Sequence, residues 1–159
     1  MHEPFRTYKQ RGEWVELKFM AEAAARGYPV LKPWGDSFAF DVGIDHKDGT
    51  IRVQVKSTSA RKGGGYLCRL RHGGSGEQRY NPDDVDLFAA YVVPVGAWYL
   101  IPIAAVLSPA PKMHLRFYPD GPPRPGRHDY DHDYEHYREA WDLLGKSRKE
   151  LNRHLRLSR

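Results

Sequence analysis

The chain contains 159 residues, of which 40% are hydrophobic and 28% charged, so it can form one domain with its own core and is too short for two of ordinary size. Its single cysteine excludes an intrachain disulfide and leads us to expect a cytoplasmic location. No apolar run reaches the ~18 residues of a membrane-spanning helix, and the polar N-terminus is not typical of a signal peptide, so no membrane partner is expected.

The net charge of +5 is unevenly distributed along the chain. Residues 1–144 contain 19 basic and 19 acidic residues, whereas the last fifteen contain six basic residues and one acid. A second basic zone, residues 52–79, contains seven basic residues and one acid. Such zones favour a polyanion such as nucleic acid as a partner, although a solvated basic tail is the alternative.

Residues 11–30, RGEWVELKFMAEAAARGYPV, predict a helix that ends near Gly27 and returns to extended chain. Glu, Leu, Lys, Met and Ala are good helix formers. Its apolar side chains form a stripe that is expected to face the core: Trp14, Leu17, Ala21, Ala24 and Ala25, widened by Phe19, Met20 and Ala23.

The next two segments predict an antiparallel hairpin. Residues 37–45 (SFAFDVGID) and 51–57 (IRVQVKS) both alternate apolar and polar residues, and Asp48-Gly49 between them is a turn signal. If residues 46–49 form the loop, paired residue numbers sum to 95. The apolar side chains then share one face, as burial requires: Phe40, Val42 and Ile44 opposite Val55, Val53 and Ile51.

The polar face of this hairpin carries a cluster suited to chemistry. In the favoured register Asp41 lies directly opposite Gln54, and Lys56 is two residues further along the same face. Carboxylate and amide oxygens are hard ligands suited to Mg²⁺, and a lysine can orient a water and stabilise charge developing on a phosphate. One carboxylate is few for Mg²⁺, and the preceding helix offers two more, Glu13 and Glu16.

The remaining chain predicts further strands and a terminal helix. Residues 66–71 predict the third strand of a meander, and the apolar residues 85–95 a buried central strand. Residues 97–103 and 114–119 predict two more strands, and a helix is expected from 133 onward. We therefore expect an α/β (α+β) domain with a mixed sheet over residues 1–118, a Pro/Gly- and His/Asp-rich connection over 119–132, and a basic helical extension over 133–159 packed on the same domain.

With these residues in place, residues 9–105 resemble the PD-(D/E)XK nuclease superfamily. The resemblance is carried by Gly12 with Glu16 on a helix, then by RGYPVLKPWGDSFAFD, RVQVKS and YNPDDVDLFAAYVV followed by WYLIPI. It is greatest with the bacterial branch that includes a group I intron homing endonuclease and that is similar to archaeal Holliday-junction resolvases.

The resemblance implies a restriction-endonuclease-like core that hydrolyses DNA phosphodiester bonds with Mg²⁺, for which Mn²⁺ would substitute. It makes Glu16 and Asp41 the metal-binding acids, with the Val55 carbonyl as a further ligand, and Lys56 the motif lysine. Gln54 stands where many members have Asp or Glu, and some members of this branch use Gln. The family's double-strand cutters and resolvases usually dimerise, so a homodimer or larger homo-oligomer is expected.

Several alternatives remain open from the sequence. The phase of the helix does not choose between Glu16 and Glu13, and Asp36 is another acid near Asp41. Candidate DNA contacts follow the motif strand: Ser57, Thr58, Arg61, Lys62, Arg69, Arg71 and Tyr80. The rival functions are a catalytically inactive or structure-specific DNA-binding module on the same fold, and a protein-interaction domain with an acidic partner. The DNA could be double-stranded or branched.

Overall fold

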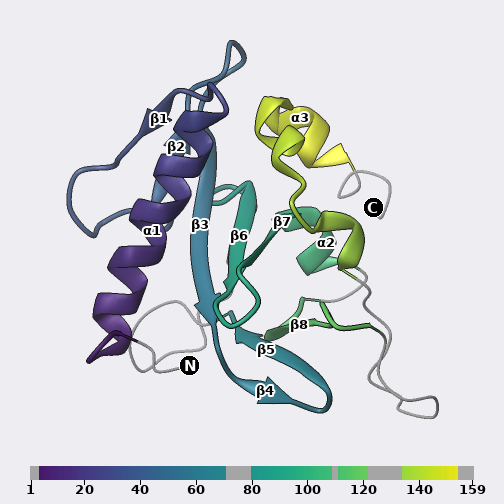
Figure 1. Cartoon of the computed structure of the whole chain (residues 1–159). Coiled ribbons are helices and arrows are strands. Elements are labelled where there is room, and N and C mark those ends of the chain that lie inside the picture. Colours follow the sequence, from purple (N-terminus) through teal and green to yellow (C-terminus); the bar gives the residue numbers. More distant parts are fainter. Residues whose placement is uncertain (1–3, 71–79, 109–110, 122–133, 154–159) are drawn as a thin grey trace.

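A computed structural model describes residues 4–70, 80–108, 111–121 and 134–153 (Figure 1). Its helices are α1 (Tyr8–Ala25), α2 (Ile103–Leu107) and α3 (Arg148–Leu151), and two 3-10 turns span Glu135–Tyr137 and Trp141–Gly145. Its strands are β1 (Val30–Leu31), β2 (Val42–Ile44), β3 (Ile51–Thr58), β4 (Arg61–Lys62), β5 (Gly65–Arg69), β6 (Leu87–Val92), β7 (Ala97–Pro102) and β8 (His114–Phe117).

The main sheet is mixed and has the strand order β1-β2-β3-β6-β7. Only β3 and β6 are parallel among its paired strands, and the other pairs are antiparallel. Every residue of β6 is buried, which confirms the predicted central strand over residues 85–95. The α/β fold class with a mixed sheet is therefore as predicted.

Two hydrophobic cores lie on opposite faces of this sheet. On one face, Val15, Phe19 and Ala23 of α1 pack against Val53 and its neighbours on the sheet. The other face packs against a smaller sheet of order β4-β5-β8, whose side chains include the buried Cys68. Figure 1 shows α1 running alongside β2 and β3, with β4, β5 and β8 beyond the far end of β3.

Helix α1 forms as predicted, but its buried stripe is rotated. Thr7 caps the N-terminus by accepting a hydrogen bond from the N–H of Gln10, and Gly27, with a φ of 87°, follows the C-terminal cap. The buried row is Val15, Phe19 and Ala23, whereas Leu17 is 63% exposed. The prediction that Leu17, Ala21, Ala24 and Ala25 face the core is wrong, because the row that includes the bulky Phe19 fills the space above the sheet. Phe19 and Ala23, which were predicted to widen the stripe, do face the core.

The β2–β3 register is as predicted, with Val42 paired with Val53 and Ile44 with Ile51. Strand β2, however, covers three residues and not the predicted nine. Phe40 packs against the second core, so its predicted place on the face of Val42 is wrong, and Phe38 before it is exposed. Strand β1 pairs only with residues 43 and 44 of β2, so residues 37–41 have no strand partner on the β1 side.

The predicted three-strand meander is also wrong, because β5 belongs to the smaller sheet and β3 pairs with β6 instead. The chain leaves the main sheet at Thr58. The Thr58 hydroxyl donates to the carbonyl of Leu67 at 2.7 Å and accepts from the N–H of Ala60 at 3.1 Å, which fixes this turn.

The continuous C-terminal helix predicted from residue 133 is wrong, although a short helix, α3, does flank the sheet. The 3-10 turns replace it because the chain pairs with β7: the N–H of Glu139 donates to the carbonyl of Trp98, and the Glu139 carboxylate accepts from the N–H of Trp98. Glu139 has a φ of 52°, which interrupts helical geometry. Trp141, Leu144 and Leu151 still join the first core. Residues 122–133, most of the predicted connection, lie outside the described residues.

No helix in the described ranges is both long and apolar enough to cross a membrane.

Candidate active site

Asp41 and Gln54 face each other across the hairpin. The N–H of Asp41 donates to the carbonyl of Val53 at 2.9 Å and extends the ladder one step beyond β2. The Asp41 Oδ2 accepts hydrogen bonds from Gln54 Nε2 at 2.6 Å and from the N–H of Val55 at 2.9 Å. The sequence therefore predicted this pairing correctly from alternation and turn position alone.

These hydrogen bonds use Asp41 Oδ2 and do not involve two other oxygens, Asp41 Oδ1 and Gln54 Oε1. The amide NH₂ must face an ionised carboxylate, so Gln54 Oε1 points away from Asp41 Oδ2. Among the described residues, neither Gln54 Oε1 nor Asp41 Oδ1 accepts a hydrogen bond. Two hard oxygen donors at one place fit the ligand preference of a divalent cation such as Mg²⁺.

Lys32 joins the first helix to this hairpin. Its Nζ donates to Glu16 Oε2 at 2.6 Å and to the carbonyl oxygen of Asp41 at 2.9 Å. Lys32 holds Glu16 Oε2, whereas Glu16 Oε1 accepts no hydrogen bond from the described residues. The structure thus brings Glu16, and not the runner-up acids, to Asp41.

The runner-up acids lie elsewhere. Glu13 is exposed on α1, with its carboxylate 4.0 Å from the Lys9 ammonium, and Asp36 is exposed in the loop between β1 and β2. Sequence reasoning missed Lys32 entirely. The sequence indicated only an extended segment after Gly27; the pairing of Leu31 with Gly43, which brings Lys32 close to Asp41, is seen in the structure alone.

Lys56 lies on the same face as Gln54 and is partly buried. Its ammonium is 5.7 Å from the ring centroid of Tyr80, which is itself buried and packed edge-on against Phe88. Burial lowers the pKa of the Lys56 ammonium, while the negative charge of Asp41 raises it. The ring of the buried Tyr80 therefore forms part of the surroundings of the Lys56 ammonium.

The carboxyl group of Asp41 is destabilised in its ionised form. Burial raises its pKa, and the carboxylate of Glu16 raises it further, against the N–H of Val55 and the ammonium of Lys56, which lower it. Two nearby carboxylates with this balance favour binding a proton or a cation. A divalent cation would stabilise the ionised form of both.

The residues predicted to contact DNA differ in whether the structure exposes or buries them. Arg61 and Lys62 on β4 and Arg69 on β5 are exposed, and the one carboxylate near Arg61, that of Asp120 at 3.5 Å, is itself exposed to solvent. Thr58 is 3% exposed and its hydroxyl is used in the β3–β4 turn, and strand alternation directs Ser57 to the face opposite Lys56. Tyr80 is buried, and Arg71 lies outside the described residues.

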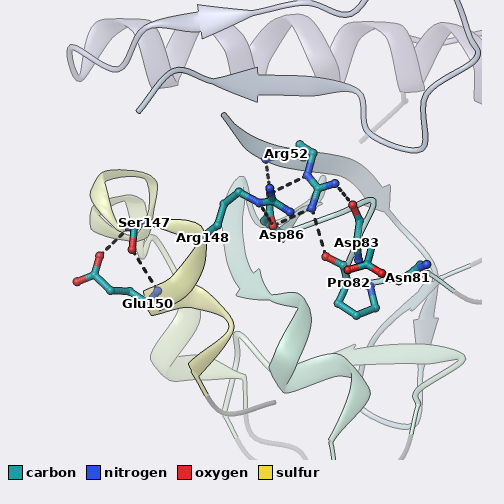
Figure 2. A network of polar contacts seen from close by, with 8 residues as sticks. All are labelled: Arg52, Asn81, Pro82, Asp83, Asp86, Ser147, Arg148 and Glu150. Atoms are coloured by element: carbon teal, nitrogen blue, oxygen red, sulfur yellow. Dashed lines mark hydrogen bonds and ion pairs between the residues drawn. The ribbon is translucent and has the colours of Figure 1, made fainter. Parts of the chain in front are cut away.

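A network of ion pairs and hydrogen bonds surrounds the buried carboxylate of Asp86 (Figure 2). Asp86 is fully buried and accepts hydrogen bonds from the backbone N–H, Nε and Nη2 of Arg52 and from Nε of Arg148. Arg52 also donates to the carbonyls of Pro82 and Asp83. The network joins β3, the turn that follows Tyr80, and α3, so Arg148 of the basic C-terminal zone has a structural partner.

The mixed sheet with its covering helix, and the acid, amide and lysine on one hairpin, define the restriction-endonuclease-like class of nuclease folds. The sequence model of the PD-(D/E)XK endonucleases matches residues 6–137, and the chain belongs to this family. Its structure is similar to that of a bacterial homing endonuclease, I-Ssp6803I, with 28% sequence identity, a TM-score of 0.64, and coverage of 88% of this chain and 92% of that chain. No curated protein matches the chain significantly. The predicted resemblance is thereby confirmed.

The candidate metal site contains two carboxylates, where a site built from acids alone would contain three. Within the described ranges, no group of three His, Cys, Asp or Glu side chains could hold a metal ion. The set here is two acids with the amide oxygen of Gln54, which explains that result. The donors are all hard oxygens and fit Mg²⁺ in kind.

Proposed function

We propose that this endonuclease hydrolyses DNA phosphodiester bonds at Asp41, Glu16, Gln54 and Lys56 in a Mg²⁺-dependent reaction in which Mn²⁺ can replace Mg²⁺. The observation that carries the proposal is the contact of Asp41 with Gln54, which leaves Asp41 Oδ1 and Gln54 Oε1 without a hydrogen bond from the described residues, within reach of the Lys56 charge. The family match to PD-(D/E)XK endonucleases supports the reaction class.

Asp41, Glu16, the Gln54 amide oxygen and the Val55 carbonyl would hold the metal. Bound there, Mg²⁺ would polarise the scissile phosphate and lower the pKa of a coordinated water. The N–H of Val55 and the Gln54 amide fix the Asp41 carboxylate in place, so that its second oxygen needs no reorganisation to bind.

Lys56 would orient the attacking water and stabilise the negative charge that develops on the phosphate. Its partial burial strengthens both interactions, because a charge acts over a longer range where water is excluded. The Tyr80 ring beneath its ammonium limits the positions that the side chain can adopt.

Arg61, Lys62 and Arg69 would bind the DNA backbone on the hairpin formed by β4 and β5. Their exposure, and the DNA substrate implied by the family, support this role. Ser57 and Thr58 are weaker candidates, because the hydroxyl of Thr58 already has partners within the protein. We also propose a homodimer, since cutting both strands of a duplex needs two sites.

A cleavage panel tests the proposal. Linear, nicked, flapped and four-way DNA are incubated with the protein in Mg²⁺, in Mn²⁺ and in EDTA. We expect cleavage of at least one substrate with either metal and none in EDTA. Binding of DNA without cleavage of any substrate in either metal would contradict the proposal.

That outcome would favour the second candidate, a DNA-binding module without catalysis. The observation behind it is Gln54, whose neutral amide contributes less metal affinity than a carboxylate. Calorimetric titration with Mn²⁺ separates the two: the nuclease binds the metal, and the Asp41→Asn protein binds it much more weakly. Absence of Mn²⁺ binding by the wild-type protein would support the inactive module.

A further inference from the structure

The loop between β1 and β2, residues 32–41, exposes an aromatic surface next to the candidate active site. Trp34 is 94% exposed and Phe38 is 57% exposed. Of the six large hydrophobic side chains exposed in the described part of the chain, three lie within residues 31–38. Single exposed apolar residues are ordinary, but a concentration of this kind indicates a binding surface.

Both ends of the loop are fixed at the site. Lys32 bonds Glu16 and the carbonyl of Asp41, so the first and last residues of the loop meet at the proposed metal ligands. Trp34 is two residues from Lys32, which keeps its backbone within about 7 Å of that lysine. Figure 1 shows the loop standing out beyond α1, on the side of the sheet where β2 begins.

The second aromatic residue is supported by the core. The Phe38 ring lies 5.8 Å from the ring of Phe40, and Phe40 packs against the second core. Gly35 has a φ of 70°, a conformation that glycine adopts readily, and it follows Trp34 directly. The loop thus has a defined path that presents Trp34 to solvent.

The charges of the loop make a DNA base a better partner for its aromatic side chains than a phosphate group. Lys32 is already paired with Glu16, and Asp36 is an exposed carboxylate that would repel a phosphate. An aromatic ring stacks on any nucleobase, because every base has a flat π face. In continuous duplex DNA these faces are covered by neighbouring bases, whereas a flap exposes them and a nick lets the bases that flank it unstack more easily.

We propose that Trp34, with Phe38 in the same loop, stacks on an uncovered DNA base beside the phosphate cleaved at Asp41, so that the preferred substrate is DNA with an unstacked base at the point of cleavage. This inference rests on the proposed nuclease function and specifies its substrate class. Lys32 connects the aromatic loop to the proposed metal site, because it fixes the ends of the loop and also binds the carboxylate of Glu16.

The test compares DNA binding by fluorescence anisotropy in EDTA, so that no strand is cut. Nicked, flapped and continuous duplexes of one sequence are titrated with wild type, Trp34→Ala and Trp34→Phe. We expect wild type to bind the nicked or flapped DNA at least tenfold more tightly than the duplex. Trp34→Ala should lose most of this ratio while binding the duplex within about twofold of wild type, and Trp34→Phe should retain most of it.

Leu17→Ala is the matched control, because Leu17 is exposed on α1 and lies outside the loop. Thermal unfolding checks that each variant is folded. An unchanged preference in Trp34→Ala would overturn the inference, as would a change in oligomeric state measured by sedimentation without any change in DNA binding. In either case cleavage by wild type in Mg²⁺ would leave the proposed function standing, whereas absence of both DNA binding and cleavage would overturn the two together.

Discussion

Gln54 is the residue at which this site departs most clearly from a set of three acids. Its Nε2 donates to Asp41 Oδ2 at 2.6 Å, and it therefore positions the acid as well as offering its own oxygen. A glutamate in its place would put a second carboxylate against Asp41. The amide of Gln54 binds a metal less strongly than a carboxylate would, but its hydrogen bond holds Asp41 in place when no metal is bound.

We predict that Gln54→Glu binds Mn²⁺ several-fold more tightly than wild type, as measured by calorimetry at neutral pH. In EDTA the variant should unfold more easily by roughly 1–3 kcal/mol, because it loses a hydrogen bond and gains like-charge repulsion. Gln54→Ala serves as the control that removes the contact without adding charge. Equal metal affinity in Gln54→Glu and wild type would argue against a metal at this position.

Lys32 holds Glu16 at 2.6 Å and the carbonyl of Asp41 at 2.9 Å, and we predict that it positions the helix acid. Lys32→Met should lower kcat about tenfold to a hundredfold, in the range found for residues that orient metal ligands. Lys9→Met is the matched control, since Lys9 is an exposed lysine whose ammonium is 4.0 Å from Glu13. If both variants cleave DNA at the wild-type rate, Lys32 has no positioning role.

The pairing of Asp41 with Gln54 could be predicted because strand alternation has a period of two and Asp48-Gly49 fixes the turn. Lys32 could not be predicted in the same way. Its contact with Glu16 depends on how α1 lies over the sheet, and the phase of α1 was itself mispredicted. Contacts between elements depend on packing that a local pattern does not specify.

Among the elements, the C-terminal segment departs most from its local sequence pattern. Tyr137, Trp141 and Leu144 have helical spacing, yet Glu139 bonds the backbone of Trp98 and the chain follows the edge of β7. Long-range pairing with a strand edge therefore overrides helix propensity here. The smaller sheet was missed for a similar reason, since β5 pairs with the distant β8.

The C-terminal segment is attached to the sheet by the ion pair of Arg148 with Asp86. Burial raises the pKa of the Asp86 carboxyl, but its hydrogen bonds from Arg52 and Arg148 outweigh burial and hold the pKa below the ordinary value. The stabilisation is therefore present above about pH 4 and is lost as the pH falls through the folded-state pKa.

We predict that Asp86→Asn lowers the free energy of unfolding at pH 7 by about 3 kcal/mol, because it leaves the partly buried Arg52 without its charge partner. The difference from wild type should begin to shrink below about pH 4 and disappear as the pH falls through the lower folded-state pKa, where Asp86 in the folded protein becomes protonated. Urea unfolding at several pH values measures both. A difference that does not change with pH would mean that the ion pair is not what stabilises this contact.

Across the whole molecule, the fold places one sheet between two cores and leaves the basic β4–β5 hairpin at the end of β3 (Figure 1). The class of fold could be predicted from the order of elements and the buried β6. The division into two sheets could not, because it depends on which strand edges meet. The predicted basic zone is only partly available to DNA, since Arg52 within it binds Asp86.

This arrangement predicts a salt dependence of DNA binding. Arg61→Ala should weaken binding similarly across DNA sequences and reduce the slope of log affinity against log salt by about 1, since one phosphate contact is lost. Arg148→Ala is the comparison, because Arg148 is engaged by Asp86, and its loss should leave the slope unchanged. Equal slopes for Arg61→Ala and wild type would place the DNA on another surface.

The assignment of the site is tested most directly by cleavage kinetics of Lys56→Met and Asp41→Asn in Mg²⁺, with DNA binding measured in parallel in EDTA. Lys56 and Asp41 share the site with Gln54, and neither variant adds bulk. We predict that each lowers the cleavage rate by about a hundredfold or more, a range typical for loss of an electrostatic contact to the transition state, while DNA affinity changes little. Cleavage by either variant at the wild-type rate would contradict the assignment of this site.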